Sequence, residues 1–284
     1  MTTKLIADAG STKVEWCLVG ADGNVKERFT TCGINALLIS EDELDAILTN
    51  VKTQLGEASL EDEIHYYGAG CATPAICQKM VRALHRFFPG AMVYVGSDLL
   101  GAARALCGRK PGIACILGTG SNSCLYDGST ITNNVPSLGY VLGDEGSGAA
   151  LGKRLVADAF KGHLPAMIRE NFLATYKLSL ADILENVYRK PAPNTFLASL
   201  VPFIKENIWN PYLYSLVLEE LTYFVKRNVA MYVGAHSLPI NFTGSIAFHF
   251  EKILREAAST HGYRVNNVVA SPMDGLIKYH AQKD

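Results

Sequence analysis

Apolar and polar positions alternate along the chain with two different periods, and their order predicts an α/β protein. Residues 4–9 form an apolar run typical of a buried strand. Residues 14–20 and 24–31 alternate in the manner of two further strands, joined through Asp22-Gly23. The chain therefore opens with three consecutive strands.

Helices and strands then follow in turn. Ser40 and Glu43 have the spacing of a capping box at the start of an amphipathic helix, and residues 63–70 predict the next strand. The remaining elements expected in this half are a helix opened by Pro74, a strand at residues 91–96 and a helix that begins near Asp98.

The same order restarts near residue 113. Residues 113–120 predict a strand that enters a glycine turn, and residues 121–126 and 129–135 predict two more strands around Asp127-Gly128. Residues 239–280 then repeat the end of the first half, with Gly244, Gly262 and Gly275 corresponding to Gly68, Gly90 and Gly101. Such internal repetition predicts two copies of one domain.

The two copies differ mainly by an insertion. Residues 146–236 carry helical patterns throughout. The stretch 107–112 interrupts the apolar pattern with charge, proline and glycine. We therefore expect a first domain over residues 1–110 and a second over residues 111–284, with a helical insertion at about 146–236.

Composition narrows the class of protein. The chain has 284 residues, 49% of them hydrophobic, and a net charge of -1, so it can bury a large core. No concentrated basic patch is visible, which argues against nucleic acid and anionic membranes as partners. No apolar run has the length of a signal peptide core or a membrane span, so we expect a cytoplasmic protein.

Cysteine and histidine spacing points away from disulfides and zinc. The seven cysteines are irregularly spaced, never as C-x-x-C, and most lie within apolar runs. No two of the seven histidines are three or four residues apart, as a pair of ligands on one helical face would be.

Two turns rich in glycine and hydroxyl side chains are the strongest chemical signal. Each presents backbone N–H groups with little side-chain bulk, as in "AGSTK" at residues 9–13 and "GTGSN" at residues 118–122. Either turn alone is better explained as an ordinary hairpin. Because the domain is duplicated, the pair predicts a clamp for a polyphosphate.

Other nucleotide motifs do not fit these stretches. The segment "GSGAALGKR" is one residue short of a P-loop, and Arg154 stands where Ser or Thr is needed. A strand follows "GTGSNS" where a dinucleotide fingerprint requires a helix.

Three aspartates lie near these features. Asp8 precedes the first turn and could hold Mg²⁺. Asp98 follows a strand, where it could act as a general base or merely cap a helix, a role that Ser97 could also fill. Asp144 lies in the glycine-rich loop "GYVLGDEGSG", which favours ligand binding over a plain solvated turn.

Taken together, the segments "DAGSTK", "GTGSN", "GDEGSG" and "TGS" (243–245), in this order and spacing, resemble the actin-like ATPase superfamily of sugar and acetate kinases, heat-shock chaperones and actin. Within it the chain looks like the N-acetylglucosamine kinase branch. That branch shares a wider family with the ATPase activators of benzoyl-CoA reductases.

The resemblance implies two duplicated ribonuclease-H-like domains flanking a nucleotide cleft, with ATP and Mg²⁺ as cofactors, and a homodimer. It implies that Asp98 is the catalytic base and that Asp8 is near the metal. The nucleotide-binding positions it implies are Asp8, Gly10, Ser11, Thr12, Gly118, Thr119, Gly120, Ser121, Thr243, Gly244 and Ser245. The sugar-binding positions it implies are Asn35, Asn122 and Asp144, the last of which could instead serve the metal.

The chain departs from the family pattern at Ala9, where glycine is common, and at Tyr140, where mammalian relatives have an aromatic-rich loop. The expected function is an ATP-dependent kinase of the 6-hydroxyl of N-acetylglucosamine or a close amino sugar. N-acetylmuramic acid, for which Lys153 or Arg154 could pair with the lactyl carboxylate, and glucosamine remain alternative acceptors. An ATPase activator of a partner enzyme, with a cluster bridged near Cys115 and Cys124, and a sugar-binding regulator are the alternative classes.

Overall fold

The computed structural model describes residues 2–56 and 62–282. Contacts divide the chain into two compact units. Unit 1 comprises Met1–Lys110, Tyr126–Ile131 and Ser271–Asp284, and unit 2 comprises Pro111–Leu125 and Thr132–Ala270. The predicted division into a first domain of residues 1–110 and a second of residues 111–284 stays a prediction.

Unit 1 is built on a five-stranded sheet in the order β3-β2-β1-β4-β5. Its strands are β1 (Lys4–Ala9), β2 (Lys13–Val19), β3 (Val25–Cys32), β4 (Glu63–Gly68) and β5 (Met92–Ser97). Strands β1, β4 and β5 are parallel, and β1 pairs with β2 antiparallel. Its helices are α1 (Glu41–Leu55), α2 (Pro74–Phe87), α3 (Asp98–Cys107) and α13 (Met273–Ala281).

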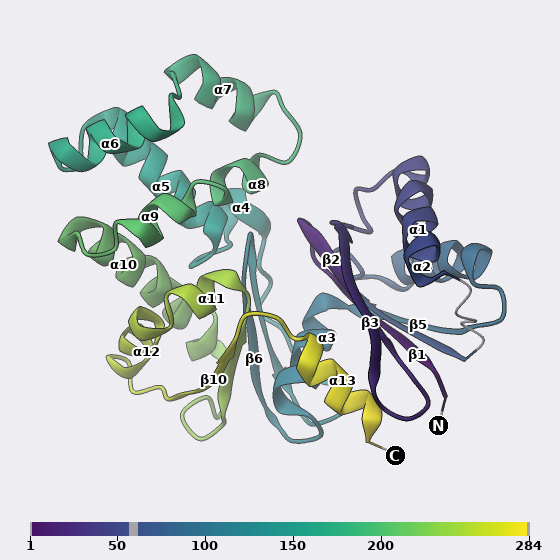
Figure 1. Cartoon of the computed structure of the whole chain (residues 1–284). Helices are drawn as coiled ribbons and strands as arrows, with labels where there is room; N and C mark the ends of the chain where they lie inside the picture. The colour runs from purple at the N-terminus through teal and green to yellow at the C-terminus, as the bar shows by residue number, and fades with distance from the viewer. Residues whose placement is uncertain (1, 57–61, 283–284) are drawn as a thin grey trace. The chain divides into compact units, whose positions relative to one another are not determined.

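Helices cover both faces of this sheet. Because successive strand residues point to opposite faces, Leu5 packs with the residues of α1 and α2, whereas Ile6 packs with Met273 and Leu276 of α13. Figure 1 shows α1 and α2 together on one side and α3 beside α13 on the other. Because helices lie on both faces of the sheet, the carboxyl ends of β1, β4 and β5 lie between two helical layers.

Unit 2 repeats the sheet order as β10-β9-β6-β7-β8. Its strands are β6 (Gly112–Leu117), β7 (Ser121–Tyr126), β8 (Ile131–Asn133), β9 (Ile240–Thr243) and β10 (Val265–Val269). Strands β6, β9 and β10 are parallel, as β1, β4 and β5 are in unit 1. The matching order and direction confirm the duplicated α/β fold predicted from the sequence.

Between β8 and β9 the chain is helical. The helices there are α4 (Gly139–Leu142), α5 (Gly148–Lys161), α6 (Ala166–Tyr176), α7 (Leu180–Tyr188), α8 (Pro193–Ala198), α9 (Val201–Glu206), α10 (Pro211–Arg227) and the 3₁₀ turn η1 (Val229–Met231). Helices α11 (Ser245–His249) and α12 (Glu251–Ser259) follow β9. The repeat of the first half implies a single helix between Gly244 and Gly262, but the backbone leaves the helical conformation at Phe250, whose side chain is buried.

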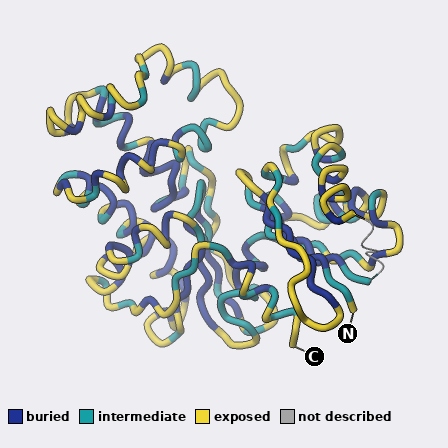
Figure 2. The backbone as a smooth tube through the Cα atoms, viewed as in Figure 1, coloured by how far each residue is buried: buried dark blue, intermediate teal, exposed yellow. Residues whose placement is uncertain are grey.

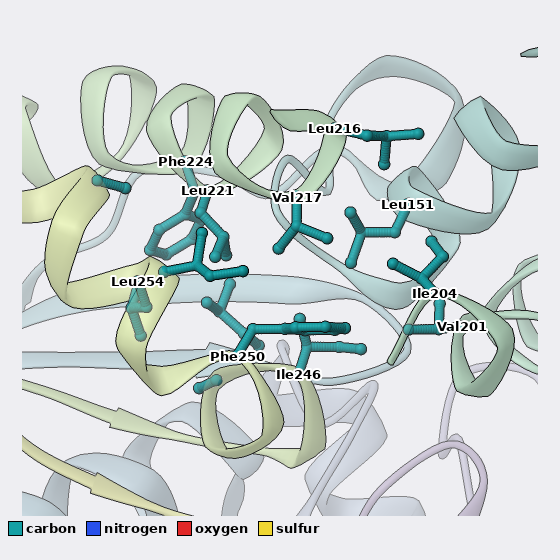
Figure 3. Packing of buried hydrophobic residues seen from close by; sticks show 14 of the residues in the cluster. Leu151, Val201, Ile204, Leu216, Val217, Leu221, Phe224, Ile246, Phe250 and Leu254 are labelled. Atoms are coloured by element: carbon teal, nitrogen blue, oxygen red, sulfur yellow. The ribbon is translucent and has the colours of Figure 1, made fainter. Parts of the chain in front are cut away.

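The core of unit 2 joins its sheet to this helical segment. Figure 3 shows Leu221 and Phe224 of α10 facing Leu254 of α12 and Ile246 of α11. The outer helices contribute less: Figure 2 shows α6 and α7 largely exposed, whereas β6, β7 and β9 are mostly buried. None of the helices in residues 2–56 and 62–282 is long and apolar enough to cross a membrane.

Local sequence signals explain several helix starts. Ser40 and Glu43 exchange both hydrogen bonds of the predicted capping box at the start of α1. Pro74 occupies the first turn of α2, and Thr73 caps it by accepting from the N–H of Ile76.

Candidate functional site

The candidate residues of unit 1 gather at the carboxyl ends of its parallel strands. Register pairs Ala9 of β1 with Gly68 of β4, and Gly68 with Ser97 of β5. Asp8 therefore lies one residue before this edge and Asp98 immediately after it. Carboxyl ends of parallel strands are where α/β proteins bind ligands.

The first glycine turn is held by backbone bonds and lies against Asn35. Gly10 donates its N–H to the carbonyl of Lys13 at 3.0 Å, and Ile34 donates to the carbonyl of Gly10 at 3.1 Å. Asn35 Nδ2 donates to Ser11 Oγ at 3.4 Å. The structure thus brings together the predicted phosphate turn and the predicted sugar ligand Asn35, while Ser11 and Thr12 stay exposed.

Asp98 is free of the capping role left open by the sequence. Ser97 is the N-cap of α3, and its hydroxyl accepts from the N–H of Leu100 at 3.1 Å. Asp98 Oδ1 accepts from the N–H of Leu99 at 2.8 Å. Burial raises the pKa of Asp98 despite these backbone bonds, which brings the carboxylate closer to the proton affinity that a general base needs.

Asp8 has the more strongly altered carboxyl group. Burial, and then the negative charges of Asp98 and Glu15, raise the pKa of Asp8 to about 7, with Lys13 acting in the opposite direction. A divalent cation would offset the repulsion between these carboxylates, and a carboxylate oxygen is a ligand that Mg²⁺ prefers. The residues present therefore fit a magnesium ion held by Asp8.

Tyr66 is a neighbour that sequence reasoning missed. Its side chain is fully buried, and its hydroxyl has no hydrogen-bond partner among the residues described. Burial raises the pKa of Tyr66 well above its usual value, and Cys71, Asp98 and Asp8 add to the effect. A tyrosine within an apolar strand gives no sequence signal of this proximity.

In unit 2 the second glycine turn is joined to the loop before α5. Gly148 donates to the carbonyl of Gly118 at 2.8 Å, and Ala149 donates to the carbonyl of Thr119 at 3.0 Å. Ser121 donates its N–H to Asp144 Oδ1 at 3.1 Å. The motifs at residues 118–121 and 144–148 therefore form one structure.

Asp144 is held in an unusual conformation. It is buried, and its φ of 56° lies in the left-handed region that few residues other than glycine adopt. Burial raises the pKa of Asp144, although the bond from Ser121 opposes this. A buried, strained carboxylate beside a glycine turn is typical of a ligand site.

The motif at residues 243–245 also adjoins this turn. Gly244 has a φ of 111°, and a Cβ there would lie 2.3 Å from the carbonyl oxygen of Leu117. The preceding Thr243 is buried, and its hydroxyl has no partner within the described part of the chain. Ser245 is exposed at the first position of α11.

Other candidates are engaged elsewhere. Asn122 Oδ1 accepts from the N–H of Ser123 at 2.9 Å and from Asn134 Nδ2 at 3.0 Å. Arg154 forms ion pairs with Glu219 and Glu220, so it is not available for a substrate carboxylate.

Lys153, the other candidate for pairing with a lactyl carboxylate, donates from Nζ to the carbonyl of Tyr140 at 3.1 Å.

The remaining candidates are the cysteines and possible metal ligands. Cys115 and Cys124, the candidates for a bridged cluster, are fully buried. The described residues contain no group of three or more His, Cys, Asp or Glu side chains placed to hold a metal.

Solved structures resemble the chain over its whole length. A protein from Porphyromonas gingivalis, proposed to be an N-acetylglucosamine kinase, is 46% identical with a TM-score of 0.94, covering 99% of this chain and 98% of its own. A proposed N-acetylglucosamine kinase from Chromobacterium violaceum is 18% identical with a TM-score of 0.75, covering 98% of this chain and 99% of its own.

A more distant structure has the same fold. The glucokinase of the ROK family from Streptomyces griseus, solved with glucose and AMPPNP, is 14% identical with a TM-score of 0.52, covering 98% of this chain and 97% of its own. At this identity the likeness extends to the fold alone. No protein-family model and no curated protein matches the chain.

Proposed function

Because the chain belongs to the N-acetylglucosamine kinase branch of the actin-like ATPase superfamily, we propose that it transfers the γ-phosphate of ATP to the 6-hydroxyl of N-acetylglucosamine. The observation that best supports this role is the state of Asp98. Its helix is capped by Ser97, so the carboxylate at the strand edge is available to accept a proton.

In the proposed reaction, the sugar oxygen bonds to the γ-phosphorus as the bond from that phosphorus to the β-γ bridging oxygen breaks, and ADP leaves. Asp98 accepts the proton of the 6-hydroxyl. Phosphoryl transfer depends mainly on positioning and on stabilising charge, so the rest of the chain acts through binding.

We propose the following roles for the binding residues. The backbone N–H groups of the two glycine turns, Asp8–Thr12 and Gly118–Ser121, bind phosphate oxygens. Thr243, Gly244 and Ser245 bind the adenosine. Asp8 holds Mg²⁺, which neutralises charge on the phosphoryl oxygens when bound. Asn35, Asn122 and Asp144 bind hydroxyls of the sugar ring.

Substrate choice is tested directly by turnover. ADP release in the presence of Mg²⁺ and ATP would be measured with N-acetylglucosamine, N-acetylmuramic acid, glucosamine, N-acetylmannosamine and glucose. The highest kcat/KM is expected for N-acetylglucosamine. Arg154 already pairs with two glutamates, which disfavours N-acetylmuramic acid. Slow ATP hydrolysis that no sugar stimulates would overturn the kinase proposal in favour of a partner-activating ATPase.

We further propose that the protein is a cytoplasmic homodimer. We also propose that its two domains divide between residues 110 and 111. The exposed row Leu180, Leu184 and Tyr188 on α7 supports a protein interface, since these side chains are 58%, 48% and 77% exposed. Light scattering of the purified protein tests the dimer. A monomer mass at all concentrations would refute it.

A further inference from the structure

The hydroxyl group of Tyr66 is buried in unit 1 without a hydrogen-bond partner. The side chain of Tyr66 is fully buried, and no described residue forms a hydrogen bond with its hydroxyl. Burying a hydroxyl costs free energy that a hydrogen bond normally offsets. Buried tyrosine hydroxyls usually have a partner, so an exception indicates a functional role or a bound water.

The ring of Tyr66 extends toward the carboxyl end of its strand. Tyr66 lies in β4, beside Ala7 of β1 and Val95 of β5. A Cβ on Gly68, two residues further along β4 and on the same face, would lie 2.4 Å from Cε1 of Tyr66 and 3.0 Å from its hydroxyl oxygen. The ring therefore covers Gly68, and only glycine leaves room for it there.

This orientation brings the hydroxyl to the edge of the sheet where Asp98 lies. Register pairs Gly68 with Ser97, and Asp98 follows directly. Neighbouring strands are about 4.8 Å apart, so a hydroxyl that covers Gly68 is near the start of α3. Burial, and then the charges of Cys71 and Asp98, raise the pKa of Tyr66 well above its usual value. The hydroxyl therefore keeps its proton and can act as a donor.

The carboxylate of Asp98 can accept a further hydrogen bond. It accepts from the N–H of Leu99 at 2.8 Å and from its own backbone N–H. A carboxylate has about four acceptor positions on its two oxygens. Burial raises the pKa of Asp98, so these backbone bonds do not replace all the stabilisation that water gives to the charged form. An O–H donor beside the carboxylate would supply more of it.

We propose that Tyr66 is a positioning residue, whose hydroxyl donates a hydrogen bond to the carboxylate of Asp98 when the sugar is bound and so orients that carboxylate toward the 6-hydroxyl. This inference rests on the proposed kinase function, which supplies the role of Asp98. Tyr66 keeps its proton throughout and takes part in no covalent step. In the free protein its unpartnered hydroxyl lowers stability, whereas during turnover the bonded hydroxyl holds the base in place.

Tyr67, the next residue of β4, provides a matched control. Its side chain packs on the opposite face of the sheet, with the residues of α13. There its hydroxyl accepts from Nη1 of Arg104 at 2.8 Å and lies 2.9 Å from Nε2 of His280. Both tyrosines are buried in one strand, but only the hydroxyl of Tyr67 has hydrogen-bond partners among the described residues. Phenylalanine at either position removes one hydroxyl and keeps the ring.

The two variants are expected to change stability in opposite directions. Tyr66→Phe removes an unpartnered hydroxyl and is expected to raise the Tm by about 2–4 °C, whereas Tyr67→Phe removes a bonded one and is expected to lower it. Thermal unfolding of the full chain without ligands measures both. If Tyr66→Phe lowered the Tm as much as Tyr67→Phe, the hydroxyl of Tyr66 would already be bonded in the free protein, and the proposal would be overturned.

Steady-state kinetics test the link to Asp98. Tyr66→Phe is expected to lower kcat for N-acetylglucosamine by about tenfold, with the KM values of sugar and ATP changed by less than about twofold, because the hydroxyl does not bind substrate. Tyr67→Phe is expected to keep the kcat of the wild type. In the Asp98→Asn background, Tyr66→Phe is expected to cause no further loss, since the hydroxyl acts through that carboxylate.

The outcomes separate this inference from the kinase proposal. ADP release that no sugar stimulates in the wild type would overturn the kinase proposal and this inference with it. An active wild type beside an unchanged kcat in Tyr66→Phe would overturn the positioning role alone. An equal loss of kcat from Tyr66→Phe with and without Asp98→Asn would show that the hydroxyl acts on another group, which would also overturn it.

Discussion

Ser121 donates its backbone N–H to Oδ1 of Asp144 at 3.1 Å, and this bond ties the second glycine turn to the loop that precedes α5. Asp144 is buried, so its carboxylate has lost hydrating water, and the hydrogen bond from Ser121 offsets part of that cost. The same carboxylate also closes the space around Gly120, where a Cβ would lie 3.0 Å from Oδ2. The shape of the turn and the position of a candidate sugar ligand thus depend on one residue.

Two substitutions at Asp144 separate these roles. Asp144→Ala removes the acceptor of a buried N–H and places alanine in the left-handed region, so we expect the free energy of unfolding to fall by about 2 kcal/mol. Asp144→Asn keeps an acceptor and tolerates this backbone conformation, so its loss of stability is expected to be much smaller. Its KM for the sugar is expected to rise. Urea unfolding and steady-state kinetics measure both; equal destabilisation by the two variants would contradict this account.

Asp98 and Ser97 provide a matched pair for the mechanism. Asp98→Asn removes the proton acceptor and is expected to lower kcat by about 10²-fold or more, with nucleotide binding nearly unchanged. Ser97→Ala removes the cap of α3 and is expected to cost about 1 kcal/mol of stability with little effect on kcat. Turnover assays, nucleotide titration and thermal unfolding distinguish them. If the serine variant lost as much kcat as the aspartate variant, the helix end itself and not the carboxylate would control turnover.

Gly118 offers a test of the second phosphate turn. A Cβ at this position meets no heavy atom within 4 Å, so Gly118→Ala is expected to fold with the stability of the wild type. If the turn binds phosphate, the added methyl group occupies ligand space and weakens ATP binding by about tenfold.

Gly244→Ala is the contrasting variant, because its Cβ would collide with the carbonyl oxygen of Leu117 and its backbone has a positive φ. The main effect of Gly244→Ala is expected to be a loss of stability. ATP titration by fluorescence or calorimetry, beside thermal unfolding, separates the two cases. Unchanged ATP affinity in folded Gly118→Ala would remove this turn from the nucleotide site.

The sequence predicts the features that arise from local signals. The capping residue Ser40, the proline that opens α2 and the glycine turns after β1 and β6 depend on interactions within a few residues. The repeat of these signals was sufficient to predict the duplicated fold. Asp8 and Asp98 adjoin recognisable strands for the same reason, whereas Asn35 was predicted only through the family resemblance.

Long-range packing escaped prediction. The carboxyl-terminal helix α13 packs through Met273 and Leu276 onto the sheet of unit 1, although the chain reaches it only after unit 2. Nothing local in the sequence specifies this partner. The ion pairs of Arg154 with Glu219 and Glu220 are likewise made by residues far apart in the chain.

The carboxyl group of Asp8 links the site to stability. Its folded-state pKa of about 7 lies above the usual aspartate value of 3.8, chiefly through burial and then through the charges of Asp98 and Glu15. The folded protein therefore binds this proton more tightly than the unfolded chain does. Ionising Asp8 opposes folding, so its contribution makes the protein less stable as pH rises from about 4 to about 7.

Asp8→Asn is expected to remove this pH dependence. Without Mg²⁺, the urea midpoint of the wild type should fall relative to that of Asp8→Asn as pH rises through this window, because only the wild type gains a buried charge. Asp22→Asn is the control: hydrogen bonds from Lys26 and Asn24 lower the pKa of the exposed Asp22 to about 2, so its effect has the opposite sign and lies at lower pH. Mg²⁺ should recover part of the lost stability in the wild type and none in Asp8→Asn. Parallel midpoints for wild type and Asp8→Asn across the window would show that Asp8 ionises at its usual pH and that its pairing with Asp98 is weak.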